Sequence, residues 1–565
     1  MRSQPWSLLS ALALIAAGFT SAAFGENSEY FNEVYNPDGT PRPGYAEILP
    51  YYKKLTPRQH LDFAKVTRKD FRGDNALDAM PRILTESELS TLQKGVEQRG
   101  KAIQAFLKDY FSGNKEIEKL IPQSVLDRIV ARSQDTAWKG QVDPKQISFP
   151  YGPDIIRDAQ GSWRVIEDNP GFIGGPGDLV LARESLMRRM PDYKQALSPV
   201  NDPLDFYREL VKRYSSLRNP SDGRIVLYSV PPYPDREDRR LKRIFHDLGV
   251  DIVGPTTAKR IINDESGVWV TDSTDPKAKR QRVGFVIINS EHSFMDPTHP
   301  AAYERALVEE ARGHLSERGQ SAVAKAKLNK ALTPDPKTGK LNLQAIRDAL
   351  SQSEVQNSMS YYKKLAAKGL NEAILKGKVA ANYTPGLDFI GDKEFYVYVD
   401  DMVRHYLKEE PVLKNLPTER FGTMNANGSV SLNRELVEKV FSNPSRYVVK
   451  AVDGRGGDAV WVGAKISPEK FKEAKAQIEA DPARFIVQEY THLSVAGDKI
   501  VDLRMISAVD PKGVYVSGTP WARALPLDGD GKVNLSSSGR EMTVLVVKDP
   551  KKNCFTQALT NSLAR

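Results

Sequence analysis

The sequence predicts a mixed α/β fold made of several lobes, and three observations support this expectation. Apolar residues recur at helical spacing over residues 86–111. From residue 224 the pattern changes to strand, helix and strand, which is typical of a small α/β unit. At residues 447–461 a β-branched run enters a glycine-rich loop and returns into a second strand. A chain of 565 residues is also too long for a single hydrophobic core.

The first 25 residues have the three parts of a secretory signal peptide. Met1 and Arg2 precede an apolar run over residues 8–19, and Ala23 and Gly25 are the small residues that a cleavage site requires. The run is shorter than the about 20 residues that span a bilayer, and an uncleaved anchor is the alternative. We expect cleavage after Gly25, export to the periplasm or the medium, and no stable membrane insertion afterwards.

Composition excludes some classes of protein. The formal net charge of +9 comes from 81 basic and 72 acidic residues that are spread along the chain. This balance favours anionic ligands modestly, but it does not predict nucleic-acid binding. Cys554 is the only cysteine, so the chain has no intramolecular disulfide even in an oxidising compartment.

Residues 26–145 predict a segment of loops and helices. The clearest helix covers residues 86–111, and its apolar face is suited to covering a neighbouring lobe. Six apolar residues make up that face: Leu89, Leu92, Val96, Ile103, Phe106 and Leu107.

Residues 146–215 predict strands that carry oxygen ligands. Residues 147–169 alternate strand with turn, and residues 158–161 form the tight connection. We expect Asp154 near the end of one strand and Glu167 and Asn169 on the next, where residues two apart point to the same face. Oxygen ligands without Cys or His suit Mg²⁺. A solvent-exposed acidic hairpin is the alternative.

The middle of the chain predicts two further units. Residues 216–315 form the small α/β lobe, with strands at 224–230, 250–253 and 283–288 and a helix at 238–248. Residues 316–378 form a helical insertion that is rich in Lys, Ala, Gln and Leu, interrupted by a polar turn at 334–340. We interpret its charged residues as a solvated helical face. The cluster of Glu291, His292, Asp296 and His299 lacks metal-site spacing and is interpreted as a polar loop.

Residues 379–548 contain a loop suited to binding phosphate, and residues 549–565 form a tail. Gly454, Gly456 and Gly457 would let backbone N–H groups approach phosphate oxygens closely, and Lys450 adds a positive charge at the end of the preceding strand. The spacing matches neither the P-loop nor the dinucleotide-binding motif. An ordinary β-hairpin is the alternative, because Asp-Gly is a common turn signal.

Several of these segments together resemble the circularly permuted ATP-grasp proteins of type 2, relatives of the glutathionylspermidine synthetase type of ligase. In that family the metal-binding strands precede the nucleotide-binding lobes, and here Glu167 likewise precedes Lys450. The resemblance implies a permuted ATP-grasp core, a small α/β lobe similar to a pre-ATP-grasp domain, and helical additions. The matching motifs lie at residues 80–111, 149–171, 392–418, 447–463, 485–490, 501–505 and 536–540.

The resemblance also implies roles for individual residues. Lys393 and Lys450 are similar to the two phosphate-binding lysines, and the three glycines to the mobile loop that follows the second one. Gln488, Glu489 and Tyr490 resemble the connector that reads adenine and the sugar. Asp502, Arg504 and Arg523 resemble the polar groups at the phosphates, with the two arginines at the acyl-phosphate site. Asp154, Glu167 and Asn169 resemble the magnesium ligands.

The implied activity is that of an ATP- and Mg²⁺-dependent ligase that joins a carboxylate to an amine through an acyl phosphate. A non-catalytic binding protein for an anionic peptide or cell-wall ligand is the first alternative, and a kinase or nucleotidyl transferase on the same scaffold is the second. Export creates a tension, because an enzyme whose KM for ATP lies between about 1 μM and 1 mM needs a supply of ATP outside the cytoplasm.

Overall fold

A computed structural model shows how the chain is arranged. It describes residues 29–71, 76–133, 141–229, 236–254, 257–272, 274–275, 277–289, 308, 311, 322–333, 342–351, 367–425, 429–452, 459–533 and 539–550. Four sequence predictions lie outside these residues: the signal segment, the turn at 334–340, the polar loop at 291–299 and the glycines at 454, 456 and 457. The lobe boundaries stay predictions.

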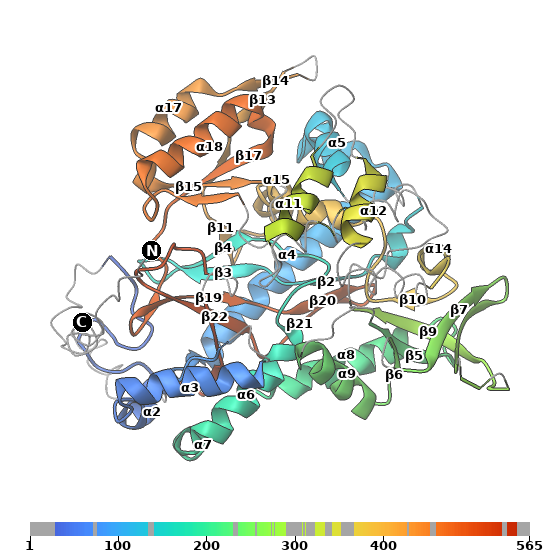
Figure 1. Cartoon of the computed structure of the whole chain (residues 1–565), viewed down its shortest axis with the longest axis horizontal. Coiled ribbons are helices and arrows are strands. Elements are labelled where there is room, and N and C mark those ends of the chain that lie inside the picture. Colours follow the sequence, from blue (N-terminus) through green and yellow to red (C-terminus); the bar gives the residue numbers. More distant parts are fainter. Residues whose placement is uncertain are drawn as a thin grey trace, which may run out of the picture.

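A central sheet joins early and late parts of the chain. Its strand order is β11-β4-β3-β19-β22-β23, and β18 pairs with β19. Strand β3 lies between β4, which follows it in the chain, and β19, which comes more than 300 residues later. Figure 1 shows β3 and β4 beside β19 and β22. The strands are β3 (Asp154–Arg157), β4 (Trp163–Glu167), β11 (Lys414–Asn415), β18 (Val495–Ala496), β19 (Lys499–Arg504), β22 (Trp521–Pro526) and β23 (Arg540–Met542).

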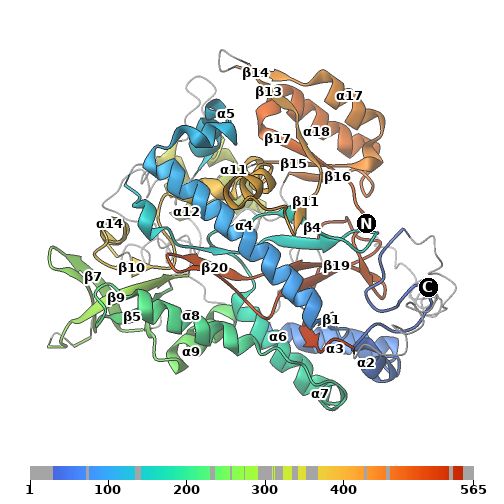
Figure 2. The same ribbon diagram turned by 180° about the vertical axis from the view of Figure 1, so that it is seen from behind.

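Helix α4 (Glu86–Ser112) crosses one face of this sheet, the face that is turned toward the viewer in Figure 2. It begins with a capping box in which Thr85 and Glu88 satisfy each other's backbone N–H groups. It ends at Gly113, whose φ of 71° suits a left-handed C-cap. Five of the six apolar residues predicted to form its buried face are buried, and Leu89 is partly buried, so the predicted helix is confirmed.

A second sheet forms the upper lobe. Its order is β12-β17-β15-β16, and Figure 1 shows helices α17 and α18 lying across one face of it. Strands β15 and β16 form an antiparallel hairpin in which Lys450 lies opposite Val460. The predicted strands on both sides of the glycine-rich stretch are therefore confirmed. The elements are β12 (Thr418–Arg420), β13 (Gly422–Met424), β14 (Val430–Leu432), α17 (Arg434–Ser442), η8 (Pro444–Arg446), β15 (Tyr447–Ala451), β16 (Val460–Val462), α18 (Pro468–Ala480), η9 (Pro482–Arg484) and β17 (Phe485–Glu489).

A third sheet belongs to the α/β lobe. Strands β5, β6 and β9 are parallel, β10 joins them on β9, and α8 and α9 pack beside them. The predicted strands and helix of this lobe are confirmed, and two antiparallel strands extend the sheet beyond them. The elements are α6 (Pro176–Arg189), α7 (Pro191–Ala196), α8 (Pro203–Leu217), β5 (Arg224–Tyr228), α9 (Arg236–Asp247), β6 (Asp251–Val253), β7 (Lys259–Asp264), β8 (Gly267–Asp272), β9 (Gln281–Ile288) and β10 (Ala380–Ala381).

A strand also lies in the N-terminal segment, where none was expected. Residues 82–85 form β1 (Arg82–Thr85), which pairs in parallel with β24 (Val544–Val547), whereas the sequence predicted only loops and helices before residue 146. A four-residue strand has no readable alternation of its own, and its partner lies at the other end of the chain.

The remaining described elements complete the lobes. Helices α11 and α12 confirm the helical character of the described part of the insertion. These elements are α2 (Tyr45–Tyr52), α3 (Pro57–Asp70), η2 (Lys115–Lys119), α5 (Gln123–Arg132), η4 (Pro144–Gln146), β2 (Phe149–Tyr151), α11 (Ala322–Ala331), α12 (Leu343–Ser351), α14 (Leu370–Leu375), η6 (Asp388–Gly391), α15 (Lys393–Tyr396), α16 (Val399–Met402), η7 (Val403–Leu407), β20 (Ser507–Asp510) and β21 (Gly513–Val516).

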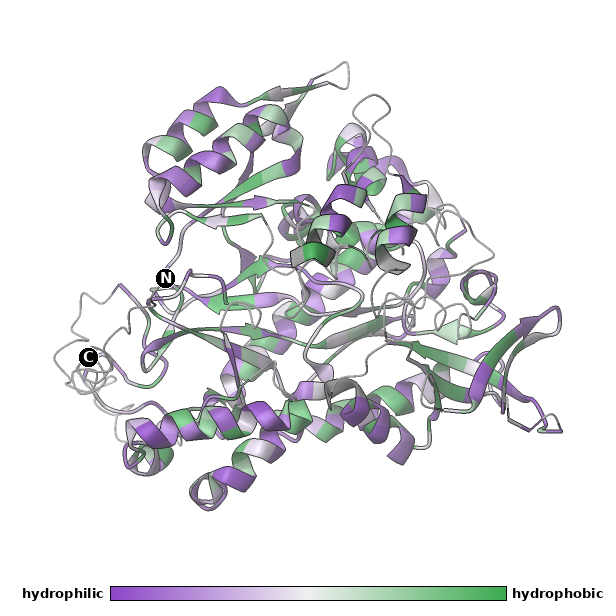
Figure 3. Ribbon diagram, viewed as in Figure 1, coloured by the Kyte–Doolittle hydropathy of each residue, from purple (hydrophilic) through white to green (hydrophobic). Residues whose placement is uncertain are grey.

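Figure 3 shows that hydrophobic residues dominate the strands of the sheets, while hydrophilic and hydrophobic residues alternate along the helices. This is the pattern of amphipathic helices that cover buried sheets. Among the described helices, none combines the length and the apolar character needed to cross a bilayer.

Candidate functional site

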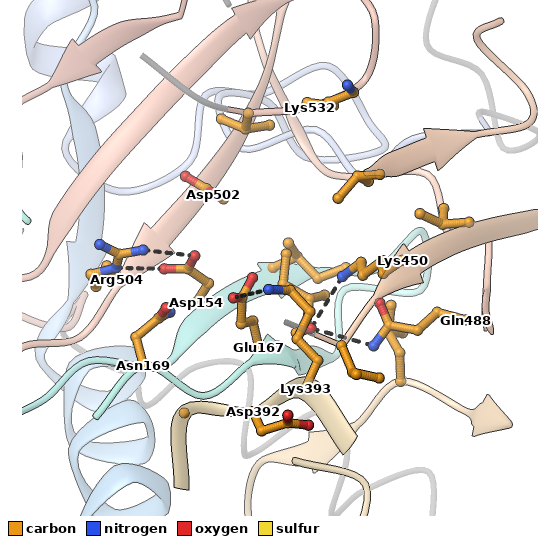
Figure 4. A pocket seen from close by; sticks show the side chains of 18 of the residues that line it. Asp154, Glu167, Asn169, Asp392, Lys393, Lys450, Gln488, Asp502, Arg504 and Lys532 are labelled. Carbon is orange, nitrogen blue, oxygen red and sulfur yellow. Dashed lines mark hydrogen bonds and ion pairs between the residues drawn. The ribbon is translucent and has the colours of Figure 1, made fainter. Parts of the chain in front are cut away.

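A cavity of about 540 Å³ has walls from both the central sheet and the upper sheet. The structure brings together all of the predicted site residues that it describes, although they come from five separate stretches of the chain. Figure 4 shows most of them facing one another. These residues line the cavity: Asp154, Glu167, Asn169, Lys393, Lys450, Gln488, Glu489, Tyr490, Asp502, Arg504 and Arg523.

The three predicted metal ligands meet at the open end of the β3–β4 hairpin, opposite its turn. Asp154 is the first residue of β3 rather than one near its end, and it pairs with Glu167, the last residue of β4. Asn169 lies two residues beyond β4, where its carbonyl accepts a hydrogen bond from the Gly152 N–H at 2.8 Å. Because strands β3 and β4 are antiparallel, the start of one lies beside the end of the other. The expected grouping therefore forms at the edge of the hairpin.

Two buried lysines lie beside the last residues of β4. Lys393 begins α15, and its Nζ lies 3.0 Å from Oε1 of Glu167. Lys450 lies on β15, and its Nζ donates to the carbonyl of Ile166 at 3.3 Å. The two side chains are only 7% and 8% exposed. An anion entering the cavity would therefore meet both ammonium groups.

The surroundings of Lys450 disfavour its charged form. Burial lowers the pKa of Lys450 to about 8, and the positive charge of Lys393 acts in the same direction, while Glu167 and Asp154 oppose the shift. A buried ammonium with a lowered pKa is stabilised by an incoming anion. A lysine with this property is suited to binding a phosphate.

Gln488, Glu489 and Tyr490 end strand β17 and begin the crossing to the central sheet. The side chain of Gln488 donates to the Ile166 carbonyl at 3.3 Å, which is the same oxygen that Lys450 contacts. The N–H groups of Glu489 and Tyr490 donate to the carbonyls of Pro417 and Arg446. A ligand that used either N–H would have to replace a bond inside the protein.

Two arginines and two carboxylates form a compact cluster on the central sheet. Arg504 donates to both oxygens of Asp154, at 2.7 and 2.9 Å, and Arg523 lies 3.1 Å from the same carboxylate. Arg523 also donates to both oxygens of Asp502, at 3.1 and 2.6 Å. The pairing follows from the strand register, in which Asp502 lies opposite Arg523 and Arg504 lies opposite Asp154.

The protonation of the cluster follows from burial and from these pairs. Burial would raise the pKa of Asp154, but Arg504 and Arg523 outweigh it and hold that pKa at about 2. For Asp502 burial prevails, and its pKa is raised although Arg523 opposes the shift. Asp154 is therefore the more firmly ionised carboxylate of the two, and it carries two of the strongest hydrogen bonds in the cavity.

Sequence reasoning missed several cavity residues. Trp521 lies beneath both arginines, with the guanidinium carbons 5.5 and 5.1 Å from the ring centroid. It stands two residues before Arg523 on one strand, so the alternation of side chains could have placed the two on the same face. Arg132 of α5 binds Asp392 beside Lys393, at 2.8 and 3.0 Å, and no local pattern connects these segments.

The residues present fit a magnesium ion that is shared with a phosphate ligand. Among the described residues, no three His, Cys, Asp or Glu side chains gather into a metal site. Both oxygens of Asp154 are engaged by arginines, so its role as a metal ligand stays a prediction. Glu167 and the amide oxygen of Asn169 remain as ligands, whereas the buried Nδ2 of Asn169, which has no hydrogen bond, is a donor suited to a phosphate oxygen and not to the metal. Mg²⁺ usually takes one or two protein oxygens and completes its shell with phosphates and water.

The comparisons with known proteins come from sequence and from structure. A sequence model of the family described as "Circularly permuted ATP-grasp type 2" matches residues 81–300 and 345–519. An uncharacterised protein of Synechocystis is 24% identical over 540 residues, covering 90% of this chain and 95% of that protein. A Frankia alni protein named "Putative glutamate--cysteine ligase 2-3" is 25% identical over 480 residues, which cover 82% of this chain but only 47% of that protein. A solved structure, a glutathione synthetase-like effector from Globodera pallida in its apo form, has a TM-score of 0.48 and 10% identity, over 87% of this chain and 98% of that one.

Proposed function

Because the chain belongs to the circularly permuted ATP-grasp type 2 family, we propose that it is an ATP- and Mg²⁺-dependent ligase that joins a carboxylate to an amine. The observation that carries this proposal is the convergence of Lys393 and Lys450 on the end of β4, where Glu167 and Asn169 lie. Two buried cations facing oxygen ligands across one cavity are what a metal-bound triphosphate requires.

The protein's part in this reaction is alignment and charge neutralisation. Lys393 and Lys450 balance the charge of the phosphates, and Arg504 and Arg523 lie where negative charge develops on the transferred group. A carboxylate oxygen of the substrate attacks the γ-phosphorus, the bond to ADP breaks, and an acyl phosphate forms. The amine then attacks the acyl carbon, inorganic phosphate leaves, and the amine loses a proton. Mg²⁺, when bound by Glu167 and Asn169, supplies further neutralisation of the phosphate oxygens.

The name of the Frankia relative supports this class of reaction. A glutamate–cysteine ligase forms an amide from a carboxylate and an amine, and two such named relatives match this chain over 82% of its length. The chain spans 47% of each of these proteins, so their substrates are not transferred to it. The proposal is limited to a small molecule or peptide that carries a carboxylate and another that carries an amine.

Calorimetry of ATP and ADP, with and without Mg²⁺, tests the nucleotide site. We expect wild-type protein to bind both nucleotides more tightly with Mg²⁺, and Lys450→Ala to lose most of that affinity. Lys439→Ala removes an exposed lysine of the same lobe that pairs with Glu419, and it serves as the control that retains binding. Absence of Mg²⁺-dependent nucleotide binding by the wild type at millimolar ATP would exclude the ligase.

A second experiment separates the ligase from its alternatives. With ATP, Mg²⁺ and a pool of amino acids and short peptides, hydroxylamine converts an acyl phosphate to a hydroxamate. Formation of the hydroxamate together with ADP and phosphate supports the ligase. A stable phosphorylated product indicates a kinase, release of pyrophosphate indicates a nucleotidyl transferase, and binding without turnover indicates a binding protein.

We also propose that the chain is exported, on the strength of the predicted signal segment at residues 1–25. An ATP-dependent enzyme outside the cytoplasm needs a compartment or a recipient cell that contains ATP. A reporter fused after residue 25 tests export, and a fusion that is active only in the cytoplasm would contradict it.

A further inference from the structure

A fully buried arginine lies directly behind the candidate site. Arg99 is on α4, and its guanidinium has an exposed fraction of 0%. It donates to Asp168 at 2.6 and 3.3 Å and to Asp400 at 2.8 Å. It also donates to the side-chain oxygen of Asn415 at 2.8 Å and to the carbonyl of Leu413 at 3.2 Å. One side chain therefore connects α4 to three other parts of the chain.

The first of these connections reaches the metal side of the cavity. Asp168 stands between Glu167 and Asn169, and because side chains alternate along an extended segment, it points away from the cavity while they point into it. Arg99 holds both oxygens of this carboxylate, and the hydroxyl of Tyr151 donates to one of them. These bonds fix Asp168 in place. They therefore oppose a rotation of the segment that would turn Glu167 or Asn169 out of the cavity.

The second connection reaches the phosphate side. The helical turn that begins at Lys393 ends at Tyr396, whose carbonyl accepts a hydrogen bond from Nδ2 of Asn415 at 2.9 Å. The other oxygen of Asp400 accepts from the N–H of Asn415 at 3.0 Å. Arg99 binds both Asn415 and Asp400, so it holds the end of the turn that carries Lys393.

We propose that Arg99 is a positioning residue that sets the spacing between the metal ligands Glu167 and Asn169 and the phosphate lysine Lys393. The proposal rests on the function proposed above. Arg99 touches no group in the cavity and acts through Asp168 on one side and through Asn415 and Asp400 on the other. Groups behind metal ligands fix the orientation of those ligands, and their loss typically weakens metal affinity about 10–100-fold.

The main test is Asp168→Asn, which keeps the size of the side chain and removes one charge of the clamp. We expect the Mg²⁺ concentration that half-maximally enhances ADP binding to rise about 10-fold or more. ADP affinity without Mg²⁺ should fall by a smaller factor, because the turn of Lys393 is loosened while Lys450 and the upper lobe are untouched. Arg99→Lys should act in the same direction, since an ammonium cannot hold Asp168 and Asn415 in a planar fork.

Glu33→Gln is the matched control. Glu33 pairs with Arg82 at 2.5 Å, both side chains are as buried as those of the Arg99–Asp168 pair, and they lie behind the opposite end of β4. Both substitutions replace a buried carboxylate by its amide and should lower the melting temperature. Only Asp168→Asn should change the Mg²⁺ dependence, and an equal change in Glu33→Gln would show that general destabilisation is the cause.

Hydrogen exchange gives a readout that does not depend on nucleotide binding. In Asp168→Asn, amide exchange should increase at residues 163–169 and at residues 393–402 together, and neither segment should respond in this way in Glu33→Gln. Unchanged exchange in either segment overturns the proposal, whatever the nucleotide result. If exchange increases in both segments but the wild-type protein shows no Mg²⁺-dependent ADP binding, the positioning role of Arg99 is supported and the proposed function is rejected.

Discussion

The ammonium of Lys393 lies 3.0 Å from the carboxylate of Glu167, although one residue begins a helical turn and the other ends a strand far earlier in the chain. The two groups pair with each other across these segments. In the proposed function, the metal would take the carboxylate and a phosphate oxygen would take the ammonium. Binding would then exchange these partners, and its affinity would depend on how many other bonds must break.

The first prediction concerns how much the buried charge of Lys450 lowers the free energy of unfolding. Its pKa is about 8 in the folded protein and 10.5 in the reference state, so the unfolded chain binds more protons between these values. Stability should rise with pH from about 8 to about 10.5, and at pH 7 the buried charge costs on the order of 3 kcal/mol. Lys450→Met should remove most of this cost and flatten the pH dependence of urea unfolding.

Lys499→Met provides the contrast for that measurement. Lys499 is largely buried, which would lower its pKa, but Asp78 and Asp498 outweigh burial and raise it. Its charge therefore stabilises the folded state below pH 10.5, and its removal should lower stability at pH 7. A loss of stability in Lys450→Met similar to that in Lys499→Met would contradict the assigned cost.

The second prediction separates the metal from the nucleotide. Glu167→Gln removes the charge of the proposed metal ligand, and we expect at least a tenfold increase in the Mg²⁺ concentration needed for ADP binding. Glu489→Gln changes an exposed carboxylate at the end of β17 that also lines the cavity. It should weaken ADP binding to the same extent with and without Mg²⁺. Calorimetric titrations at a series of Mg²⁺ concentrations distinguish these two patterns. Identical responses of the two variants would show that Glu167 and Glu489 do not act on different parts of a bound nucleotide.

Much of the fold could be predicted from sequence because its signals are local. The helix at α4 has its periodicity and capping box within one stretch, and the hairpin that brings Asp154 to Glu167 is closed by a short turn. Strand β1 could not be predicted, since the strand it pairs with, β24, lies at the far end of the chain.

The candidate site also has features that the sequence could predict and features that it could not. Residue types identified Asp502, Arg504 and Arg523 individually through the family resemblance. Their pairing could not be predicted, because it depends on the register of β3 with β19 and of β19 with β22. Arg99 showed no signal at all, because its function as a clamp exists only when α4 lies behind β4.

The third prediction concerns the buried carboxylates of the central sheet. Arg523→Met removes the ion-pair partner of Asp502 and leaves Asp154 paired with Arg504, so it should destabilise the protein by about 3–5 kcal/mol. Adding Asp502→Asn removes the carboxylate that lost its partner and should restore a part of that loss. Urea unfolding of both single variants and of the double variant gives the coupling energy. Strict additivity of the two changes would show that the pair is not coupled.

The fourth prediction concerns Trp521, whose ring lies beneath the guanidinium groups of Arg504 and Arg523. Trp521→Phe keeps an aromatic face, whereas Trp521→Leu removes it and should cost about 0.5–2 kcal/mol in contacts with each cation. Both variants lose the hydrogen bond from the indole to Glu541 at 3.2 Å, so the difference between them isolates the ring face. We expect the turnover of ATP to fall more in Trp521→Leu than in Trp521→Phe.

Gly175→Ala tests the same support through a direct contact with the ring of Trp521. The φ of Gly175 is 103°, and a Cβ there would lie 2.5 Å from the ring of Trp521, so the substitution strains the backbone and displaces the indole. If Trp521 positions the two arginines, Gly175→Ala should lower turnover as Trp521→Leu does, while ADP affinity, which depends on the lysines across the cavity, changes little. Gly113→Ala is the matched control, because its φ of 71° is also left-handed but its Cβ meets no atom within 4 Å. A similar loss of turnover in both glycine variants would attribute the effect to backbone strain and would remove Trp521 from the catalytic arrangement.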